Sequence, residues 1–244
     1  MPAPRGPGPL LIVCALGIER LALLGGGSRS GGDRNGAVRS DEVPNGAVRN
    51  GGAPASADPG APPGPVTVLR TGMGPRNAER AVRAALDDDG MRNAAVIASG
   101  FCAGLAGGMR PGDLVVAAET RHLDGVTVCT DPERLAAALS RALPGRRVHT
   151  GPLTGADHVV RGRERALLRT TGAIAADMES AATLLTALRA GPRPIAAVRV
   201  IVDAPEHELV RLGTVRGGIS AFRVLRSVLP AFHEWHRSLL LPWR

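Results

Sequence analysis

The sequence predicts an α/β domain built on a largely parallel sheet. Short apolar runs alternate with segments of helical apolar spacing along most of the chain, as strands joined by helices do. With 244 residues, of which 44% are apolar, the chain is long enough for one well-buried domain of this class. In one stretch, Gly172–Ala190, an apolar strand turns into a helix with carboxylates at the junction. Open α/β sheets bind their ligands at that end of their strands, so we expect the site there.

The first element is an apolar strand at Leu10–Leu16, followed by a helical turn that starts at Gly17. The apolar run is short, follows a single arginine and lacks a convincing small-residue cleavage site, so it predicts a strand rather than a signal peptide. No run approaches the ~18–20 apolar residues of a membrane-spanning helix. We therefore expect a cytoplasmic protein.

Residues 25–65 predict a disordered, low-complexity insertion. They are rich in Gly, Ser, Asn, Pro and Asp, and they contain the sequence NGAVR twice, at Asn35–Arg39 and Asn45–Arg49. Such a segment buries too little apolar surface to offset its loss of conformational entropy. The expected organisation is therefore one catalytic domain formed by residues 1–24 and 66–244.

Further strands are predicted from short apolar runs: Val66–Arg70, Ala94–Ser99, Leu114–Ala118, Thr127–Thr130, Arg147–Leu153 and Ile195–Val202. Thr71–Asn77 carries glycines and a proline before a helix, which suits an anion or a hydroxyl group, although a third glycine at dinucleotide spacing is missing. The small residues of 100–108 form either a close approach to a ligand or a merely tight connection.

Two predictions concern helix ends. Thr130 and Glu133 have the spacing of a capping box. The last long helix, about Gly218–Leu240, is expected to kink at Pro230.

Composition excludes several classes of site. All 30 basic residues are arginines, so a Schiff-base or P-loop lysine is excluded. The net charge of +8 is spread along the chain and aromatic residues make up only 2%, which argues against a nucleic-acid surface. The three cysteines lack metal-ligand spacing and predict buried free thiols of a reducing compartment: Cys14, Cys102 and Cys129. We expect no metal site.

The Gly172–Ala190 stretch places Asp177 and Glu179 before an Ala/Leu-rich helix that stops at Gly191 and Pro192. Taken alone, Asp177 fits a helix N-cap and Glu179 fits a first-turn acid that interacts with the helix dipole. Both carboxylates also lie where a ligand would bind in a parallel sheet.

Three segments together resemble the nucleoside phosphorylase/nucleosidase superfamily, and in particular the methylthioadenosine/adenosylhomocysteine nucleosidases. They are SGFCAGLAGGMRPGDLVV, AADMESAAT and AVRVIVDAPEHE. The resemblance runs from Leu10 to the C-terminus apart from the insertion, and it implies a mixed α/β sheet flanked by helices in a three-layer sandwich. It also implies active sites near the interface of a homodimer or higher homo-oligomer.

Within the superfamily, three further segments look like the hopanoid-associated branch: CALGIERLAL, TGMGPRNAERA and VRGGISAFRVLRSVLPAFHEWHRSLL. That likeness implies hydrolytic release of adenine from adenosylhopane, a lipid-tailed nucleoside. Two alternatives remain open, namely phosphorolysis and methylthioadenosine/adenosylhomocysteine cleavage in nucleoside salvage.

The resemblance implies roles for two acids in catalysis. Asp203 matches the acid that gives a proton to N7 of the departing base, a task that suits a partly desolvated carboxyl group. Glu19 matches the carboxylate that activates the attacking water, although a surface acid on a helix has the same pattern.

Other residues match substrate contacts. Glu179 would accept hydrogen bonds from both ribose hydroxyls, and Met178 would pack on the sugar unless it is ordinary core. His158 and Val159 stand where the family holds adenine, with His158 replacing an aromatic side chain. Residues assigned to the substrate or anion loops are Gly74, Phe101, Cys102 and Ala103.

The choice between water and phosphate depends on an arginine and a serine that hold phosphate in the related phosphorylases. Their places hold Ala98 and Phe101 here, which favours water. Arg20 or Arg76 could still supply positive charge. No cofactor is implied, and phosphate would be a co-substrate only in a phosphorylase.

Two hypotheses of another class remain. The C-terminal helix carries arginines, apolar residues and nearby Trp243, so it could lie on a bilayer at the inner face of the membrane, or it could cover the sheet. A non-catalytic nucleoside-binding module is disfavoured because Glu19, Glu179 and Asp203 are all present.

Overall fold

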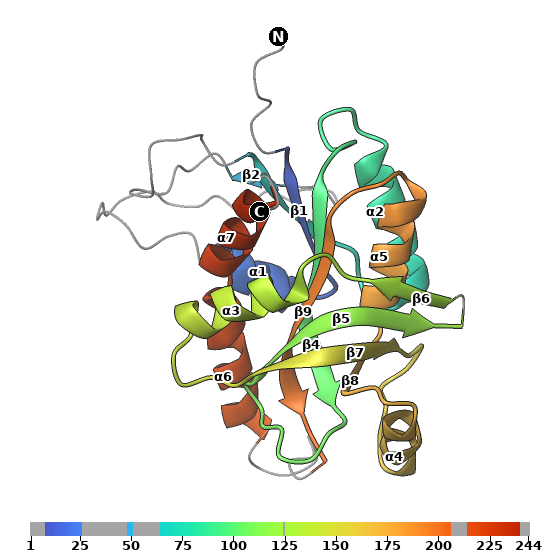
Figure 1. Ribbon diagram of the computed structural model, residues 1–244, viewed down its shortest axis with the longest axis vertical. Coiled ribbons are helices and arrows are strands. Elements are labelled where there is room, and N and C mark those ends of the chain that lie inside the picture. The colour runs from blue at the N-terminus through green and yellow to red at the C-terminus, as the bar shows by residue number, and fades with distance from the viewer. Residues whose placement is uncertain (1–7, 26–47, 51–63, 124, 206–213, 240–244) are drawn as a thin grey trace.

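The computed structural model describes residues 8–25, 48–50, 64–123, 125–205 and 214–239 (Figure 1). These residues form a nine-stranded mixed sheet in the order β2-β3-β1-β4-β8-β7-β5-β6, with β9 paired to both β4 and β5. The strands are β1 (Leu10–Cys14), β2 (Val48–Asn50), β3 (Val66–Arg70), β4 (Ala95–Gly104), β5 (Leu114–His122), β6 (Gly125–Val128), β7 (Val148–Gly155), β8 (Ala175–Asp177) and β9 (Ile195–Asp203). The predicted α/β class is confirmed.

Parallel pairing dominates the middle of the sheet. The pairs β1–β3, β1–β4, β4–β9, β5–β7 and β7–β8 are parallel, whereas β9 runs antiparallel to β5 and β8 runs antiparallel to β4. Strands β4, β9, β5, β7 and β8 thus pair in a closed cycle. The candidate site lies at the ends of β4, β8 and β9, which belong to this cycle, and of β1 beside them.

Helices cover both faces of the sheet, so the molecule has three layers (Figure 1). The helices are α1 (Gly17–Gly25), α2 (Pro75–Leu86), α3 (Pro132–Ala142), α4 (Arg163–Thr170), α5 (Ser180–Arg189), α6 (Thr214–Arg226) and α7 (Leu229–Ser238). In β1, Leu10 and Ile12 belong to the core cluster beneath α1, α3, α6 and α7, whereas Leu11 and Val13 belong to the cluster beneath α2 and α5. This alternation is the period-two pattern of a strand buried on both faces.

Some predicted boundaries differ from the structure. Strand β4 continues through Gly104, so the first part of the small-residue run is strand and not turn. The N-cap of α3 is Asp131, whose carboxylate accepts the Arg134 N–H, whereas the Thr130 hydroxyl accepts the N–H of Ile195 on β9. The predicted capping box is therefore wrong: Thr130 ties the loop to the sheet instead.

The predicted C-terminal helix is two helices. α6 ends at Arg226 and α7 begins at Leu229, with Pro230 in the first turn of α7, where its missing N–H costs nothing. Phe232 and Trp235 of α7 are fully buried. Their face covers the core and is not available to a bilayer; Trp243 lies outside the described residues.

Within the segment that we expected to be disordered, Val48–Asn50 forms a strand antiparallel to β3. Residues 26–47 and 51–63 of that segment, which include Asn35–Arg39 and most of the second repeat, lie outside the described part of the chain. Among the described helices, none combines the length and the apolar character needed to cross a membrane.

Candidate active site

A pocket with a cavity volume of about 200 Å³ opens where β1, β4, β8 and β9 end. Nearly all of the residues predicted for the site line it: Glu19, Phe101, Cys102, Ala103, His158, Val159, Met178, Glu179 and Asp203. They come from segments far apart in the sequence. Gly74 is the exception, although the preceding residue, Met73, lines the pocket.

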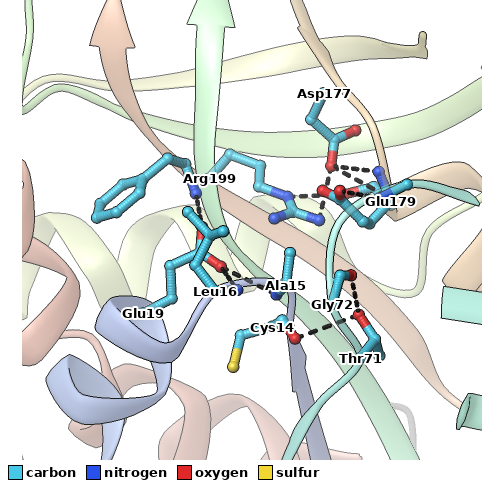
Figure 2. A network of polar contacts seen from close by, with 12 residues as sticks. Cys14, Ala15, Leu16, Glu19, Thr71, Gly72, Asp177, Glu179 and Arg199 are labelled. Atoms are coloured by element: carbon cyan, nitrogen blue, oxygen red, sulfur yellow. Dashed lines mark hydrogen bonds and ion pairs between the residues drawn. The ribbon is translucent and has the colours of Figure 1, made fainter. Parts of the chain in front are cut away.

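Glu19 lies at the bottom of the pocket and is only 2% exposed. Its Oε2 accepts the N–H groups of Ala15 at 2.9 Å and Leu16 at 2.8 Å, and its Oε1 accepts the N–H of Phe101 at 2.8 Å (Figure 2). The sequence builds this arrangement because β1 ends just before α1, which turns the first-turn acid back onto the strand end. Glu19 is therefore a buried, rigidly held carboxylate and not a surface acid.

Glu179 contacts the loop before α2. Its Oε1 accepts the N–H of Gly74 at 2.8 Å. Gly74 is the N-cap of α2 and has φ of 92°, a conformation that favours glycine. Burial raises the pKa of Glu179, and the positive charge of Arg199 opposes that effect. Gly74, which we assigned to the substrate or anion loops, thus uses its N–H to position Glu179 in this structure.

Asp177 lies at the end of β8 and combines two roles. Its Oδ2 accepts the N–H groups of Glu179 and Ser180, as the predicted helix cap would. The same oxygen pairs with Arg199 Nη2 at 2.6 Å, and Arg199 Nε donates to the Ser180 hydroxyl. Cap and ion pair together fix the start of α5, and hence Glu179.

Arg199 is a fully buried guanidinium in the otherwise apolar strand β9, and no role was predicted for it from the sequence. Figure 2 shows it between Glu19 and the pair formed by Asp177 and Glu179. Burial disfavours its charge, but Asp177, Glu179 and Glu19 outweigh burial and raise the pKa of Arg199. A single arginine in the middle of a buried strand was the available signal, because such a charge needs partners in the fold.

Glu19 and Arg199 converge over the backbone of Gly100 on β4. A Cβ atom at this position would lie 2.4 Å from Glu19 Oε1 and 2.5 Å from Arg199 Nη1. Arg199 Nη1 is buried and has no hydrogen-bond partner among the described residues. An acceptor and a donor therefore meet at one place beside the pocket.

Asp203 ends β9, lines the pocket and is only 4% exposed. Its Oδ2 forms an ion pair with Nη2 of Arg165, a buried residue of α4. Arg165 also reaches the carbonyl oxygen of Val160. The sequence offered no signal for Arg165, which is one of several arginines in a polar segment.

His158 and Val159 lie at the rim. The imidazole contacts Asp157 through Nδ1 at 2.5 Å and Glu164 through Nε2 at 2.9 Å, and hydrogen bonds with these two carboxylates raise the pKa of His158. The side chain of His158 is 59% exposed, and Val159 is 54% exposed. Both residues therefore belong to the exposed part of the pocket lining and not to its buried part.

The cysteines are buried and free, as predicted. Burial raises the pKa of Cys14 to about 12 and also raises that of Cys102, which lines the pocket. Protonated thiols of this kind are poor nucleophiles. In the described part of the chain, no group of three or more His, Cys, Asp or Glu residues is arranged to hold a metal ion.

Several solved structures of nucleosidases have a similar fold. The chain is 18% identical to the 5'-methylthioadenosine/S-adenosylhomocysteine nucleosidase of Neisseria meningitidis in complex with methylthio-immucillin-A, with a TM-score of 0.69 over 94% of this chain and 99% of that one. The futalosine hydrolase of Helicobacter pylori is 16% identical, with a TM-score of 0.70 over 93% and 98%. No curated protein sequence matches the chain significantly.

A family comparison covers most of the chain. The model of the phosphorylase superfamily matches residues 9–230, from the start of β1 into α7. The match includes every pocket residue described above. Sequence and fold agree, and the protein belongs to the phosphorylase superfamily.

Proposed function

We propose that this protein cleaves the N-glycosidic bond of an adenine nucleoside by hydrolysis. The observation that carries the proposal is the meeting of three buried carboxylates, Glu19, Glu179 and Asp203, around one pocket. Breaking this bond leaves positive character on the sugar and negative charge on the base. Of three carboxyl groups, one can donate a proton to the base, one can bind the ribose hydroxyls and one can activate water.

Asp203 is the proposed general acid, which protonates N7 of the base as the bond to C1′ breaks. Glu179 accepts hydrogen bonds from the ribose hydroxyls, and Met178 beside it packs on the sugar. His158 and Val159 at the rim hold the base. Both ring nitrogens of His158 are already bound to carboxylates. We therefore expect the backbone of His158 and Val159 to make most of the contacts with the base.

Glu19 is the proposed base that takes a proton from the attacking water. Its position next to Arg199 Nη1 over Gly100 supports this role, because a water there could donate to Glu19 and accept from Arg199. The three backbone N–H groups on the carboxylate keep it in one orientation. Preorganisation of this kind lowers the cost of reaching the transition state.

Three observations favour water over phosphate. Among the described residues no arginine lines the pocket, and neither Arg20 nor Arg76 is among its lining residues. Ala98, which stands where the phosphorylases have an arginine, is completely buried in the core. Within the described part of the chain, Arg199 has only Nη1 free, because Nε and Nη2 are engaged by Ser180 and Asp177. A phosphate dianion would therefore lack the guanidinium fork that such sites use.

For the substrate we propose a nucleoside with a large apolar 5′ substituent, adenosylhopane in particular, and peripheral contact with the inner face of a membrane. Met73 and Val159 support this proposal, because both line the pocket and are more than half exposed at 60% and 54%. Covering apolar side chains at a pocket mouth with an apolar group lowers the free energy of the complex.

The test is an adenine-release assay on adenosylhopane, methylthioadenosine and adenosylhomocysteine, each with and without phosphate. We expect adenine and a free ribosyl product without phosphate, and the highest kcat/KM with adenosylhopane. Strict dependence on phosphate would contradict hydrolysis. Failure to release adenine from all three nucleosides would contradict the proposed function as a whole.

A further inference from the structure

Helix α4 is polar, and Arg165 is its buried residue. Its neighbours Arg163, Ala166 and Leu167 are exposed, while Leu168 is half-buried. The apolar contact of the helix is made by Leu168, which packs against a small cluster formed by Leu105, Val160, Ala173 and Ala176. Arg165 supplies the buried polar contact between this helix and the pocket.

Arg165 contacts the pocket at two points. Nη2 pairs with Oδ2 of Asp203, and Nε and Nη2 both lie 3.4 Å from the carbonyl oxygen of Val160, which also lines the pocket. A guanidinium that is only 5% exposed is costly unless a carboxylate compensates its charge. Asp203 therefore fixes Arg165, and Arg165 in turn fixes Asp203.

The two oxygens of Asp203 differ in consequence. Oδ2 is occupied by Arg165, whereas Oδ1 is buried and has no hydrogen-bond partner among the described residues. A buried carboxylate oxygen without a partner is expensive, so a ligand that supplies a partner gains affinity. The structure leaves Oδ1 for the substrate.

We propose that Arg165 is a positioning residue for Asp203: it holds Oδ2 so that Oδ1 delivers the proton to the base, and its charge stabilises the carboxylate that remains. This inference rests on the proposed nucleoside cleavage. It adds a residue from α4, an element that contributes none of the proposed catalytic groups.

The proposed step balances. Asp203 enters the step with a proton from solvent on Oδ1 while Oδ2 stays on Arg165. That proton moves to N7 of the base while the bond between N9 and C1′ breaks, and the bonding electrons stay on the purine. Water adds its oxygen to C1′ and gives a proton to Glu19. Asp203 is then a carboxylate opposite Arg165; Glu19 loses its proton to solvent and Asp203 takes one up, which restores the starting state.

The experiment compares Arg165→Ala with Arg163→Ala, an exposed arginine on the same helix. Adenine release is measured with and without guanidinium chloride at tens of millimolar, and with sodium chloride at equal ionic strength. We expect Arg165→Ala to lower kcat roughly 10–100-fold, part of the range for a general acid, with KM within about twofold. Guanidinium should restore much of kcat, sodium chloride should not, and Arg163→Ala should resemble wild type.

A purely structural role for Arg165 would give another pattern. A loss of activity that neither guanidinium nor Arg165→Lys relieves would overturn the inference, as would an unchanged kcat in Arg165→Ala. Thermal unfolding of each variant shows whether the fold survives, and Arg165→Lys keeps the test valid if Arg165→Ala unfolds.

Failure of the inference differs visibly from failure of the proposed function. If wild type releases adenine and Arg165→Ala matches Arg163→Ala, the positioning role alone is wrong. If wild type releases no adenine from any of the three nucleosides, the cleavage activity is wrong, and the role of Arg165 falls with it.

Discussion

Gly100 is the residue where the site leaves least room. A methyl group there would approach Glu19 Oε1 to 2.4 Å and Arg199 Nη1 to 2.5 Å. Neither group can retreat easily, because backbone N–H groups hold Glu19 and Asp177 holds Arg199. We predict that Gly100→Ala lowers kcat/KM more than 10-fold, consistent with ~1 Å displacement of reacting groups.

The control for this prediction is Gly145→Ala. Gly145 has φ of 86°, and a Cβ atom there would meet nothing within 4 Å. Alanine at Gly145 therefore carries backbone strain of about 1 kcal/mol without a clash, and we expect full activity. Steady-state kinetics and urea unfolding of both variants separate backbone strain from displacement of the site. Equal activities in the two variants would refute the crowding argument.

Asp203 gives the second prediction at this scale. Asparagine keeps the shape of the side chain but has no proton to give to the base, so Asp203→Asn should lower turnover by ~10²–10⁴. The exposed Asp88→Asn is the matched control and should match wild type. Thermal unfolding checks the fold, because Arg165 loses its carboxylate. A folded Asp203→Asn protein with more than a tenth of wild-type turnover would exclude Asp203 as the general acid.

Sequence patterns located carboxylates better than their partners. Glu19, Glu179 and Asp203 each follow an apolar run, so their place at strand ends was predictable, and all three line the pocket. Arg165 and Arg199 could not be assigned in that way. Their contacts depend on how α4 and β9 meet strands distant in sequence, and no local spacing encodes such pairings.

At the scale of elements, α7 carries a buried histidine, His236, that makes folding stability depend on pH. His236 is 6% exposed, and burial lowers its pKa to about 4 from an ordinary value of 6.5. Between these two values the unfolded chain binds a proton that the folded chain does not, so stability falls as pH drops from about 6.5 to about 4. We predict a loss of roughly 1–2 kcal/mol at pH 5 relative to pH 7 from this residue.

Urea unfolding of wild type and His236→Leu at pH 7 and pH 5 tests this prediction. Leucine fills a similar volume and has no proton to bind, so the variant should lose less stability on acidification than wild type does. Burial also lowers the pKa of His233, so a smaller difference between the two pH values should persist in the variant. An identical loss in both proteins would exclude His236 as a source of acid lability.

Element types were easier to predict than element ends. Buried strands such as β1 and β9 are predictable from their continuous apolar runs. The end of β4 is not, because β4 extends past Ser99 through small residues that pair with β9 and β8. The break between α6 and α7 is equally a tertiary effect. Both helices bury apolar residues in the same core cluster, and a continuous helix shows the same periodicity in sequence.

At the scale of the molecule, the net charge favours membrane contact, whereas the burial of apolar side chains in α7 argues against insertion into a membrane. The net charge is +8 and all 30 basic residues are arginines, so we expect attraction to anionic lipid. The apolar face of α7 packs against the core, where Phe232 and Trp235 are fully buried. Membrane contact of this chain should therefore be electrostatic and not insertional.

We accordingly predict that the full chain floats with vesicles that contain anionic lipid at low ionic strength and is released at about 0.5 M salt, where screening acts within a few ångströms. Vesicles of neutral lipid should not float it. Deleting the chain from Arg223 would remove core residues and would report unfolding, so the full chain must be used with salt and lipid charge as the variables. Flotation with neutral vesicles that resists salt would show apolar insertion, and the membrane contact would then have to come from a surface other than the buried face of α7.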